Sequence, residues 1–253
     1  MGLISQDRSD AALSGSALLF GLSRYAPGYV PDSDEFYRKV MVAEADLGRR
    51  LRIPLVPTEV FAYPPSEDEI AALPEGSVWV EEAAYDMTRD FFQGDSWGFL
   101  ALRKRPVIAI TSLRFVYPAP LTTAWDVPMS WIRIDKKYGN LRLVPGNAIV
   151  AAPLVSWIMP MVTAGRTIPQ MIHVRYTAGL DNSNEAYPDI EDVILKTATL
   201  SLVQDTFPAQ SFSQSIDGMS QTLSTDLSKL GDAVDAKIER LRQYFSGIRM
   251  TVL

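Results

Sequence analysis

A series of short apolar segments between Leu55 and about Thr177 constrains the fold of this chain more than any other feature of its sequence. Each segment is rich in aromatic and β-branched residues, and Pro, Gly or Asn separates it from the next, which is typical of strands joined by turns. The segments are Val56 to Tyr63, Ser77 to Glu81, Trp97 to Leu102, Val107 to Tyr117, Trp131 to Asp135, Asn140 to Val144 and Met171 to Thr177. The sequence therefore predicts a β-rich region in the middle of the chain.

The clearest local prediction within this region is an antiparallel hairpin. Ile132 and Ile134 alternate with polar residues before a turn that contains Gly139-Asn140, and Leu141 and Leu143 alternate after it. Alternation on both sides of such a turn places the apolar side chains on one face of a two-stranded ribbon.

Helices are predicted on both sides of the β-rich region. Residues 1–31 mix Gly, Ser and Pro with scattered apolar residues and are expected to form an extended N-terminal arm. After this arm, Asp32 and Glu35 resemble a capping box at the start of a helix, which Pro54 ends. Apolar residues recur along that helix at three- and four-residue steps: Phe36, Val40, Ala43 and Leu47.

A second helix is predicted after Asn184. Pro188 suits a first helical turn, and the three acidic residues that follow it complement the positive end of the helix dipole. The segment IEDVILKTATLSLVQD is apolar or small on most faces, so we expect neighbouring elements to cover it on two sides. Pro208 stops this helix.

The last predicted helix follows a polar stretch and leads into an apolar end of the sequence. Its apolar residues recur at helical steps: Leu227, Leu230, Val234, Ile238, Leu241 and Phe245. Gly247 is a natural C-cap for it. The next residues, IRMTVL, are β-prone, and we expect them either to fold back on the chain's own sheet or to add as a strand to another chain.

Composition excludes several classes of active site. The chain has no cysteine, which rules out disulfides, thiol nucleophiles and thiolate metal sites. Its single histidine, His173, cannot form a two-His metal site and is interpreted as a structural residue of a strand. Nucleophile elbows, phosphate-binding loops, dinucleotide fingerprints, HExxH zinc motifs and calcium loops are all missing from the sequence. We therefore expect a protein that is not an enzyme and that binds no cofactor or metal.

The net charge of −6, from 30 acidic and 24 basic side chains, is concentrated near the C-terminus. Residues 181–253 carry 11 acids against 6 bases, which argues against a DNA-gripping groove there, because phosphate binding depends largely on Lys and Arg. The basic clusters at 49–52 and 103–105 are interpreted as solvated surface charge. The N-terminus has no basic signal segment and no apolar run long enough to span a bilayer, so a soluble protein is expected.

Several segments follow one another in an order that is known from one family. They are VAEADLGRRLRIPL, PVIAITSLRFVYP, HVRYTAGL and YPDIEDVILKTATLSLVQD. This order resembles that of the head-to-tail connector (adaptor) proteins of tailed bacteriophages, in which a strand ending in Y-T-x-G precedes a helix with a Pro-Asp-Ile type start. The segment SQSIDGMSQTLSTDL, followed by a helix and YFSGIRMTVL, is similar to the C-terminal part of phage neck proteins. The resemblance covers residues 33–63, 106–117 and 171–253.

The resemblance implies a fold and a place of action. It implies an α+β protein in which a helical adaptor core (32–63 and 166–210) carries a strand-rich, Trp-containing insertion (64–165), followed by a C-terminal linker, helix and tail (211–253). It implies a virion structural protein in the neck, between the capsid portal and the tail, that is assembled in the host cytoplasm and has no membrane contact. Such adaptors form a ring, usually of twelve copies, which extends the DNA channel under the portal and offers a platform to the next neck or tail-completion protein.

The implied partners suggest roles for particular residues. A closed ring needs two different adhesive faces on each subunit. Docking on the portal protein is assigned to the last helix and tail: Leu227, Leu230, Val234, Ile238, Leu241, Phe245, Ile248, Met250, Val252 and Leu253. Contacts with neighbouring copies are assigned to Ile190, Val193, Ile194 and Leu200. The channel wall is assigned to Asp189, Glu191 and Asp192, whose negative charge would let genomic DNA pass without binding it.

Two other functions remain open. All five Trp lie in the middle region, at positions 79, 97, 125, 131 and 157, and could form the stacking platforms of a carbohydrate- or receptor-binding virion module. A role in the core or at an interface is the commoner use of Trp. A hydrolase would need two carboxylates that face each other across a cleft.

Overall fold

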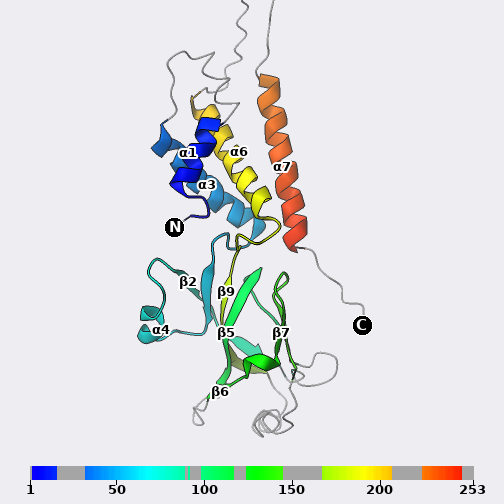
Figure 1. Cartoon of the computed structure of the whole chain (residues 1–253). Coiled ribbons are helices and arrows are strands. Elements are labelled where there is room, and N and C mark those ends of the chain that lie inside the picture. The colour runs from blue at the N-terminus through cyan, green and yellow to red at the C-terminus, as the bar shows by residue number, and fades with distance from the viewer. Residues whose placement is uncertain are drawn as a thin grey trace, which may run out of the picture. The chain divides into compact units, whose positions relative to one another are not determined.

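The computed structural model describes residues 2–15, 32–88, 91, 98–116, 124–144, 167–206 and 224–246. The chain is an α+β protein, as predicted, with helices near both ends of the sequence and strands between them (Figure 1). It divides into two compact units, which we call the helical unit (Met1–Leu55 and Asn182–Leu253) and the β unit (Val56–Asp181). None of the described helices is long and apolar enough to cross a membrane.

The described helices of the helical unit are α1 (Gln6–Gly15), α3 (Ser33–Leu51), α6 (Tyr187–Thr206) and α7 (Ser224–Ser246). Helix α3 contacts all of the other three, and α6 and α7 also contact each other (Figure 1). The unit is therefore built from two pieces of the sequence, because the β unit lies between α3 and α6 along the chain.

The apolar stripe predicted for α3 is its buried face. The four residues named for it are each at most 5% exposed: Phe36, Val40, Ala43 and Leu47. Removing a large apolar side chain from water in this way contributes about 1.5–3 kcal/mol. Asp32 stands at the N-cap, but its side chain makes no capping hydrogen bond, so the expected capping box does not form. At the other end Arg52 adopts a left-handed conformation (φ 57°), which lets its N–H donate to Gly48 O.

The N-terminal arm is not extended throughout, because residues 6–15 form helix α1. This helix packs on α3, and Ser9 is fully buried. Arg8 of α1 also forms an ion pair with Glu191 of α6. The prediction of an extended arm is wrong for this segment, since QDRSDAALSG shows no apolar periodicity and its contacts are with residues far away in the sequence. Residues 16–31 lie outside the described part of the chain.

Both C-terminal helices form where they are predicted. Helix α6 has Pro188 in its first turn and is covered on two sides, by α3 and α7. Six of its residues are at most 1% exposed: Ile190, Val193, Ile194, Ala198, Leu202 and Val203. The predicted helix stops, Pro208 and Gly247, lie outside the described residues.

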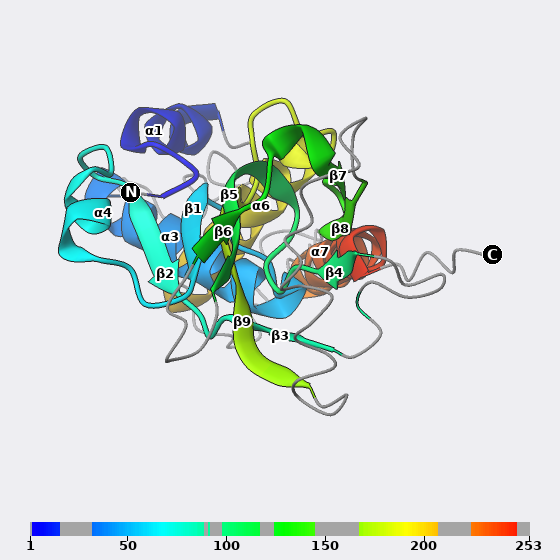
Figure 2. The ribbon, with the colours of Figure 1, turned by 90° about the horizontal axis from the view of Figure 1, so that it is seen from below.

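Two sheets form the β unit. The larger sheet has the order β2-β1-β9-β5-β6, and β3 also pairs with β9. Its strands are β1 (Thr58–Ala62), β2 (Val78–Glu81), β3 (Tyr85–Met87), β5 (Val107–Val116), β6 (Ala124–Asp126) and β9 (Ile168–Ala178). All of its pairs are antiparallel except β1 with β2. Seen from below, β9 crosses the middle of the unit beside β1 and β5 (Figure 2).

The smaller sheet contains the hairpin that the sequence predicts. Its order is β4 (Phe99–Ala101), β8 (Asn140–Leu143) and β7 (Ile132–Asp135). Ile132 pairs with Leu143 and Ile134 with Leu141, so the alternating apolar residues face each other as expected. A continuous buried core joins this sheet to the larger one.

The boundary between the units differs from the one expected from the sequence. We expected residues 32–63 and 166–210 to form one helical core, but β1 and β9 are neighbours in the larger sheet and belong to the β unit. Strands β3 and β6 and helix α4 (Glu67–Ala71) were not predicted. Each is only three to five residues long, which is too short to show a period in the sequence.

Candidate functional site

A groove on the helical unit, bounded by α3, α6 and α7, is the strongest candidate for a binding site. Its volume is about 200 Å³. Apolar side chains of all three helices line it: Leu47 from α3, Val193 and Leu200 from α6, and Val234 and Ile238 from α7. Leu200 and Ile238 are only half-buried, so the groove presents apolar surface to solvent. Apolar surface with a polar rim is typical of a contact site for another protein.

Arg50 forms one rim of this groove. Its Nε lies 2.7 Å from Asp46 Oδ2, one turn earlier in α3, and its Nη1 lies 3.1 Å from Asp235 Oδ1 of α7. The side chains of Arg50 and Asp235 are 51% and 70% exposed, so this pair contributes at most about 1 kcal/mol to stability. Its clearer effect is geometric, because one guanidinium joins α3 to α7 beside the groove.

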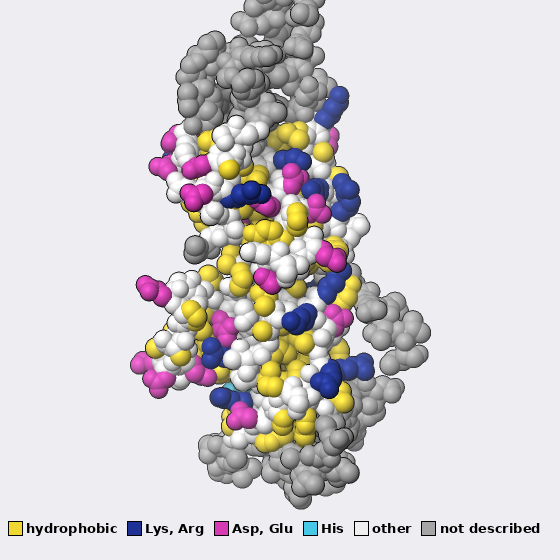
Figure 3. All heavy atoms as spheres, viewed as in Figure 1, with side chains coloured by type: hydrophobic (Ala, Val, Ile, Leu, Met, Phe, Trp, Pro, Cys, Tyr) yellow, Lys and Arg dark blue, Asp and Glu magenta, His cyan; other side chains and the backbone are white. Residues whose placement is uncertain are grey.

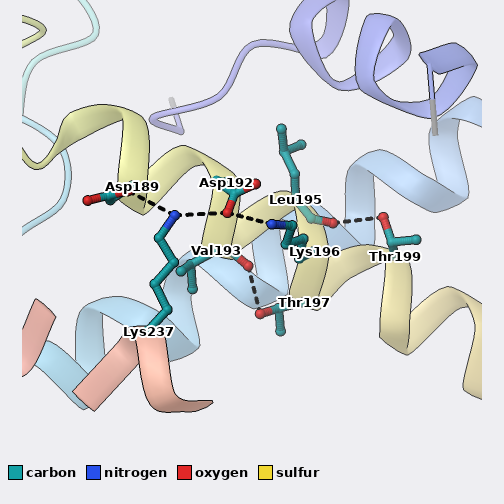
Figure 4. A network of polar contacts seen from close by, with 8 residues as sticks. All are labelled: Asp189, Asp192, Val193, Leu195, Lys196, Thr197, Thr199 and Lys237. Carbon is teal, nitrogen blue, oxygen red and sulfur yellow. Dashed lines mark hydrogen bonds and ion pairs between the residues drawn. The ribbon is translucent and has the colours of Figure 1, made fainter. Parts of the chain in front are cut away.

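Lys237 of α7 joins that helix to α6 (Figure 4). Its Nζ lies 2.8 Å from Asp189 Oδ1 and 2.9 Å from Asp192 Oδ2, and Asp192 also accepts from Lys196 Nζ at 2.8 Å. Burial alone would raise the pKa of Asp192, but hydrogen bonds from the two lysines outweigh it and lower the pKa below its ordinary 3.8. Burial would likewise lower the pKa of Lys237, and the two carboxylates raise it above 10.5. Asp192 and Lys237 therefore both stay ionised around neutral pH.

Two threonine hydroxyl groups of α6 are satisfied within the helix itself. Thr197 Oγ1 donates to Val193 O, and Thr199 Oγ1 donates to Leu195 O, both at 2.8 Å (Figure 4). Such bonds to the carbonyl one turn earlier leave no free hydroxyl proton on these side chains. Thr197 lines the groove without offering it a free hydroxyl proton, whereas Ser201 and Gln204 of the same helix also line it and add polar groups.

The acidic residues expected in a channel wall are paired within the helical unit. Asp189 and Asp192 contact Lys237, and Glu191 contacts Arg8 of α1. A carboxylate next to a cation presents little net negative charge to a passing polyanion. Their place in a channel stays a prediction, and each has a cationic partner that reduces the negative charge it would present there.

Three of the four residues expected to contact neighbouring copies are core residues. Ile190, Val193 and Ile194 are at most 1% exposed and pack inside the chain's own helical unit. Ile190 and Ile194 cannot contact another copy while the unit is folded, and Val193 contributes only a nearly buried edge to the wall of the groove. Leu200 is half-buried and lines the groove, so it remains available for such a contact.

The residues expected to dock on a portal are divided in a similar way. Val234, Leu241 and Phe245 are at most 6% exposed, because this face of α7 packs inside the helical unit. Leu230 and Ile238 are half-buried and remain accessible. The side chain of Leu227 and the tail residues Ile248, Met250, Val252 and Leu253 lie outside the described part of the chain.

Two of the described tryptophans, the half-buried Trp125 and the buried Trp131, contact each other edge to face with ring centroids 5.9 Å apart, as part of a packed aromatic cluster. Trp131 is 7% exposed and belongs to the core. Trp125 stacks on Phe115 with ring centroids 5.6 Å apart. Trp79, on the edge strand β2, is 41% exposed. Trp97 and Trp157 lie outside the described residues, so these positions add nothing to a carbohydrate-binding interpretation.

His173 lies in β9 and stacks on Tyr63, with ring centroids 5.1 Å apart and an angle of 8° between the rings. Burial is the largest effect on the imidazole and lowers the pKa of His173 below 6.5. This setting is typical of a structural histidine. Among the described residues, no group of three or more His, Cys, Asp or Glu side chains could hold a metal ion.

The residues that hold the groove together are not among the site residues predicted from the sequence. Asp46 and Arg50 are spaced for an ion pair one turn apart, a signal that the sequence contains. The partners Asp235 and Lys237 give no such signal, since their contacts cross between helices that are far apart in the sequence.

Comparison with known proteins adds little to this description. No protein-family model matches the chain, and no curated protein matches it. One similar solved structure is described as the neck of an empty GTA particle computed with C6 symmetry. The similarity covers 91% of this chain and 90% of that chain, at 15% sequence identity and a TM-score of 0.39. A similarity of this size decides neither the fold nor the function of the chain.

Proposed function

We propose that this protein is a structural component of the neck of a phage-like particle. It acts there as a head-to-tail adaptor: copies form a ring under the portal, extend the DNA channel and offer a platform to the next neck or tail-completion protein. The role is mechanical and involves no catalysis and no cofactor.

The groove between α3, α6 and α7 is the observation that supports this proposal most directly. Its walls come from the helices whose sequences resemble the adaptor family, and Leu200 and Ile238 place apolar surface there that the chain itself does not cover. A ring subunit needs such a surface on one side and a complementary one on the other. In the proposed ring the groove receives a neighbouring copy, and the tail after α7 docks on the portal.

The first test measures assembly in the presence of a portal from a phage-like particle. Mass photometry and electron microscopy of the purified chain with the portal should show a ring of the 28.1-kDa chain, with about twelve copies. The variants Leu200→Asp and Ile238→Asp should abolish the ring, because each places a charge in an apolar contact. Both side chains are half-buried, so we expect the isolated chain to keep its helical circular dichroism.

The matched control is Val42→Asp. Val42 is an apolar residue of α3, 64% exposed and not part of the groove lining. It should leave the ring intact. A ring that survives both groove variants, or one that only Val42→Asp disrupts, would show that the groove is not the subunit contact.

The tail has a separate test. Deleting residues 247–253 removes the apolar segment without touching the described part of α7, so the helical unit should unfold at an unchanged temperature. Portal binding should be lost. Unchanged binding of the shortened chain to the portal would contradict the assigned role of the tail.

A further inference from the structure

The β unit carries a concentration of positive charge in a chain whose net charge is −6. Residues 96–180 contain ten Lys and Arg but only two acids, Asp126 and Asp135. Six of these cations lie on the smaller sheet or in the segments beside it, and we call them the basic surface: Lys104, Arg105, Arg133, Lys136, Lys137 and Arg142. Dark blue side chains gather over the part of the β unit that contains β7 (Figure 3).

Backbone hydrogen bonds bring the two basic segments of this surface together. Leu102 N–H donates to Gly139 O at 2.9 Å, and Val107 N–H donates to Lys136 O at 2.7 Å. The loop after β4 therefore lies directly beside the turn between β7 and β8. Four cations from positions 104–105 and 136–137 share one end of the smaller sheet.

The outer face of the same sheet adds a row of three side chains. Arg133 of β7 is directly opposite Arg142 of β8, and Arg142 is opposite Phe99 of β4. All three are exposed, and the Arg142 guanidinium lies 5.9 Å from the centre of the Phe99 ring. Like charges opposite each other across strands repel, and a bound anion would relieve that repulsion. Arginine beside an aromatic ring is also a common element of nucleic-acid surfaces.

Few carboxylates compensate this charge. Asp135 Oδ1 accepts hydrogen bonds from the backbone N–H groups of Lys137 and Tyr138, so it is used in closing the turn. Glu82 lies 3.7 Å from Lys104 Nζ. Four cations of the basic surface form no ion pair within the described ranges: Arg105, Arg133, Lys136 and Arg142. The surface therefore remains strongly positive.

We propose that the basic surface binds the phosphate backbone of double-stranded DNA without reading its sequence. Guanidinium groups bind phosphate oxygens through paired hydrogen bonds, and lysines add point charges around them. Contacts of this kind are weak, and they let a protein slide along DNA. The inference rests on the proposed function only for the source of the DNA, which is the genome that passes through the neck.

The acids of α6 and of the groove rim in a second copy fit the basic surface less well than DNA does. The acidic residues of α6 and of the groove rim are already paired with Lys237, Lys196, Arg8 and Arg50 of their own chain. DNA brings phosphates that no residue of this chain has neutralised.

The test is fluorescence anisotropy of the full chain with short labelled duplexes of two unrelated sequences. Both duplexes should bind with the same Kd within a factor of about two, because backbone contacts carry no sequence information. If about four phosphates are contacted, the logarithm of the binding constant should fall with the logarithm of salt concentration with a slope of about −3.6. Between about 50 and 200 mM salt the affinity should then fall about a hundredfold.

Paired variants identify the surface. Arg133→Glu/Arg142→Glu should reduce the steepness of the salt slope by about two, and the neutral pair Arg133→Gln/Arg142→Gln should have an intermediate effect on affinity. The matched control Lys229→Glu/Arg240→Glu changes the net charge equally at exposed positions of α7 and should leave Kd and slope unchanged. Unchanged tryptophan fluorescence shows that the variants of the β unit are folded, and unchanged helical circular dichroism shows the same for the control pair in α7.

Each outcome decides the proposal. No binding of either duplex at the lowest salt overturns it, and so does equal weakening by the control pair. Salt-dependent self-association that Arg133→Glu/Arg142→Glu removes, in the absence of duplex binding, would assign the surface to contacts between copies instead. Ring assembly is measured separately. DNA binding without a ring would contradict only the proposed adaptor role. A ring without DNA binding would contradict only the proposed binding of DNA by the basic surface.

Discussion

Gly179, at the end of β9, is a position where one added methyl group should destabilise the β unit strongly. Its φ is +132°, a conformation that L side chains rarely adopt. A Cβ there would lie 2.5 Å from Val56 O, 2.9 Å from Val56 C and 3.1 Å from Pro57 Cα. These are backbone atoms, which cannot rotate away as the end of a side chain could. Gly179 N–H also donates to Pro106 O at 2.9 Å, so any shift of this residue weakens that bond.

The size of the effect follows from these contacts. A non-glycine residue in a rarely populated backbone region costs about 1–3 kcal/mol. Loss of the hydrogen bond to Pro106 adds about 1 kcal/mol. We therefore expect Gly179→Ala to lower the free energy of unfolding of the β unit by about 2–4 kcal/mol. The control is Gly76→Ala, because Gly76 also has a positive φ (+78°) but nothing lies within 4 Å of its added Cβ. This control should cost only about 1–2 kcal/mol.

The distribution of tryptophan supplies the assay. All five Trp lie within residues 56–181, so tryptophan fluorescence reports the unfolding of the β unit, whereas circular dichroism at the helix band reports mainly the helical unit. In urea, the fluorescence midpoint of Gly179→Ala should fall about 0.7 M below that of Gly76→Ala, for a denaturant slope of about 2 kcal/mol/M. Equal midpoints for the two variants would refute the argument from the contacts with Val56 and Pro57.

Three further predictions concern single residues. Because the chain has a single histidine, an NMR titration of His173 should give one imidazole pKa below 6.5. The folded chain then binds this proton less readily than the unfolded chain, so stability should fall as pH drops below 6.5, and His173→Phe should remove that fall. Lys237→Met should lower helical-unit stability by about 0.5–1 kcal/mol at neutral pH. Asp192 has a lowered pKa, so its stabilisation is present above 3.8 and lost as pH falls through the lowered value, and melting curves of variant and wild type should converge there. Gly231→Ala should raise the melting temperature of the helical unit, since its added Cβ meets nothing within 4 Å and alanine favours helix by about 0.5–1 kcal/mol.

Local patterns in the sequence predict most of the helices and strands. How these elements pair and pack depends on contacts between residues far apart in the sequence, which local patterns do not predict. The β7–β8 hairpin and the buried face of α3 follow from alternation and helical spacing within a few residues. The parallel pairing of β2 with β1, the central place of β9 and the helix at 6–15 depend on partners far away in the sequence. The groove follows the same rule. The local pattern predicts that Leu200 is an apolar position of α6, but it does not predict the contacts of Lys237 with α6, because they join residues that are far apart in the sequence.

The β unit is inserted between α3 and α6 along the chain, so during translation the β unit can fold before the helical unit is complete. Thr58 at the start of the unit pairs with Ala178 near its end, so the β unit closes on itself without any helix that follows it. Helix α3 leaves the ribosome before the whole of Val56–Asp181 has been translated, whereas α6 and α7, which cover its apolar face, come after. At about 5–20 residues per second the nascent chain exposes that face for on the order of ten seconds. The β unit therefore has time to fold first, and the N-terminal helices are the segment of the nascent chain that most needs a chaperone.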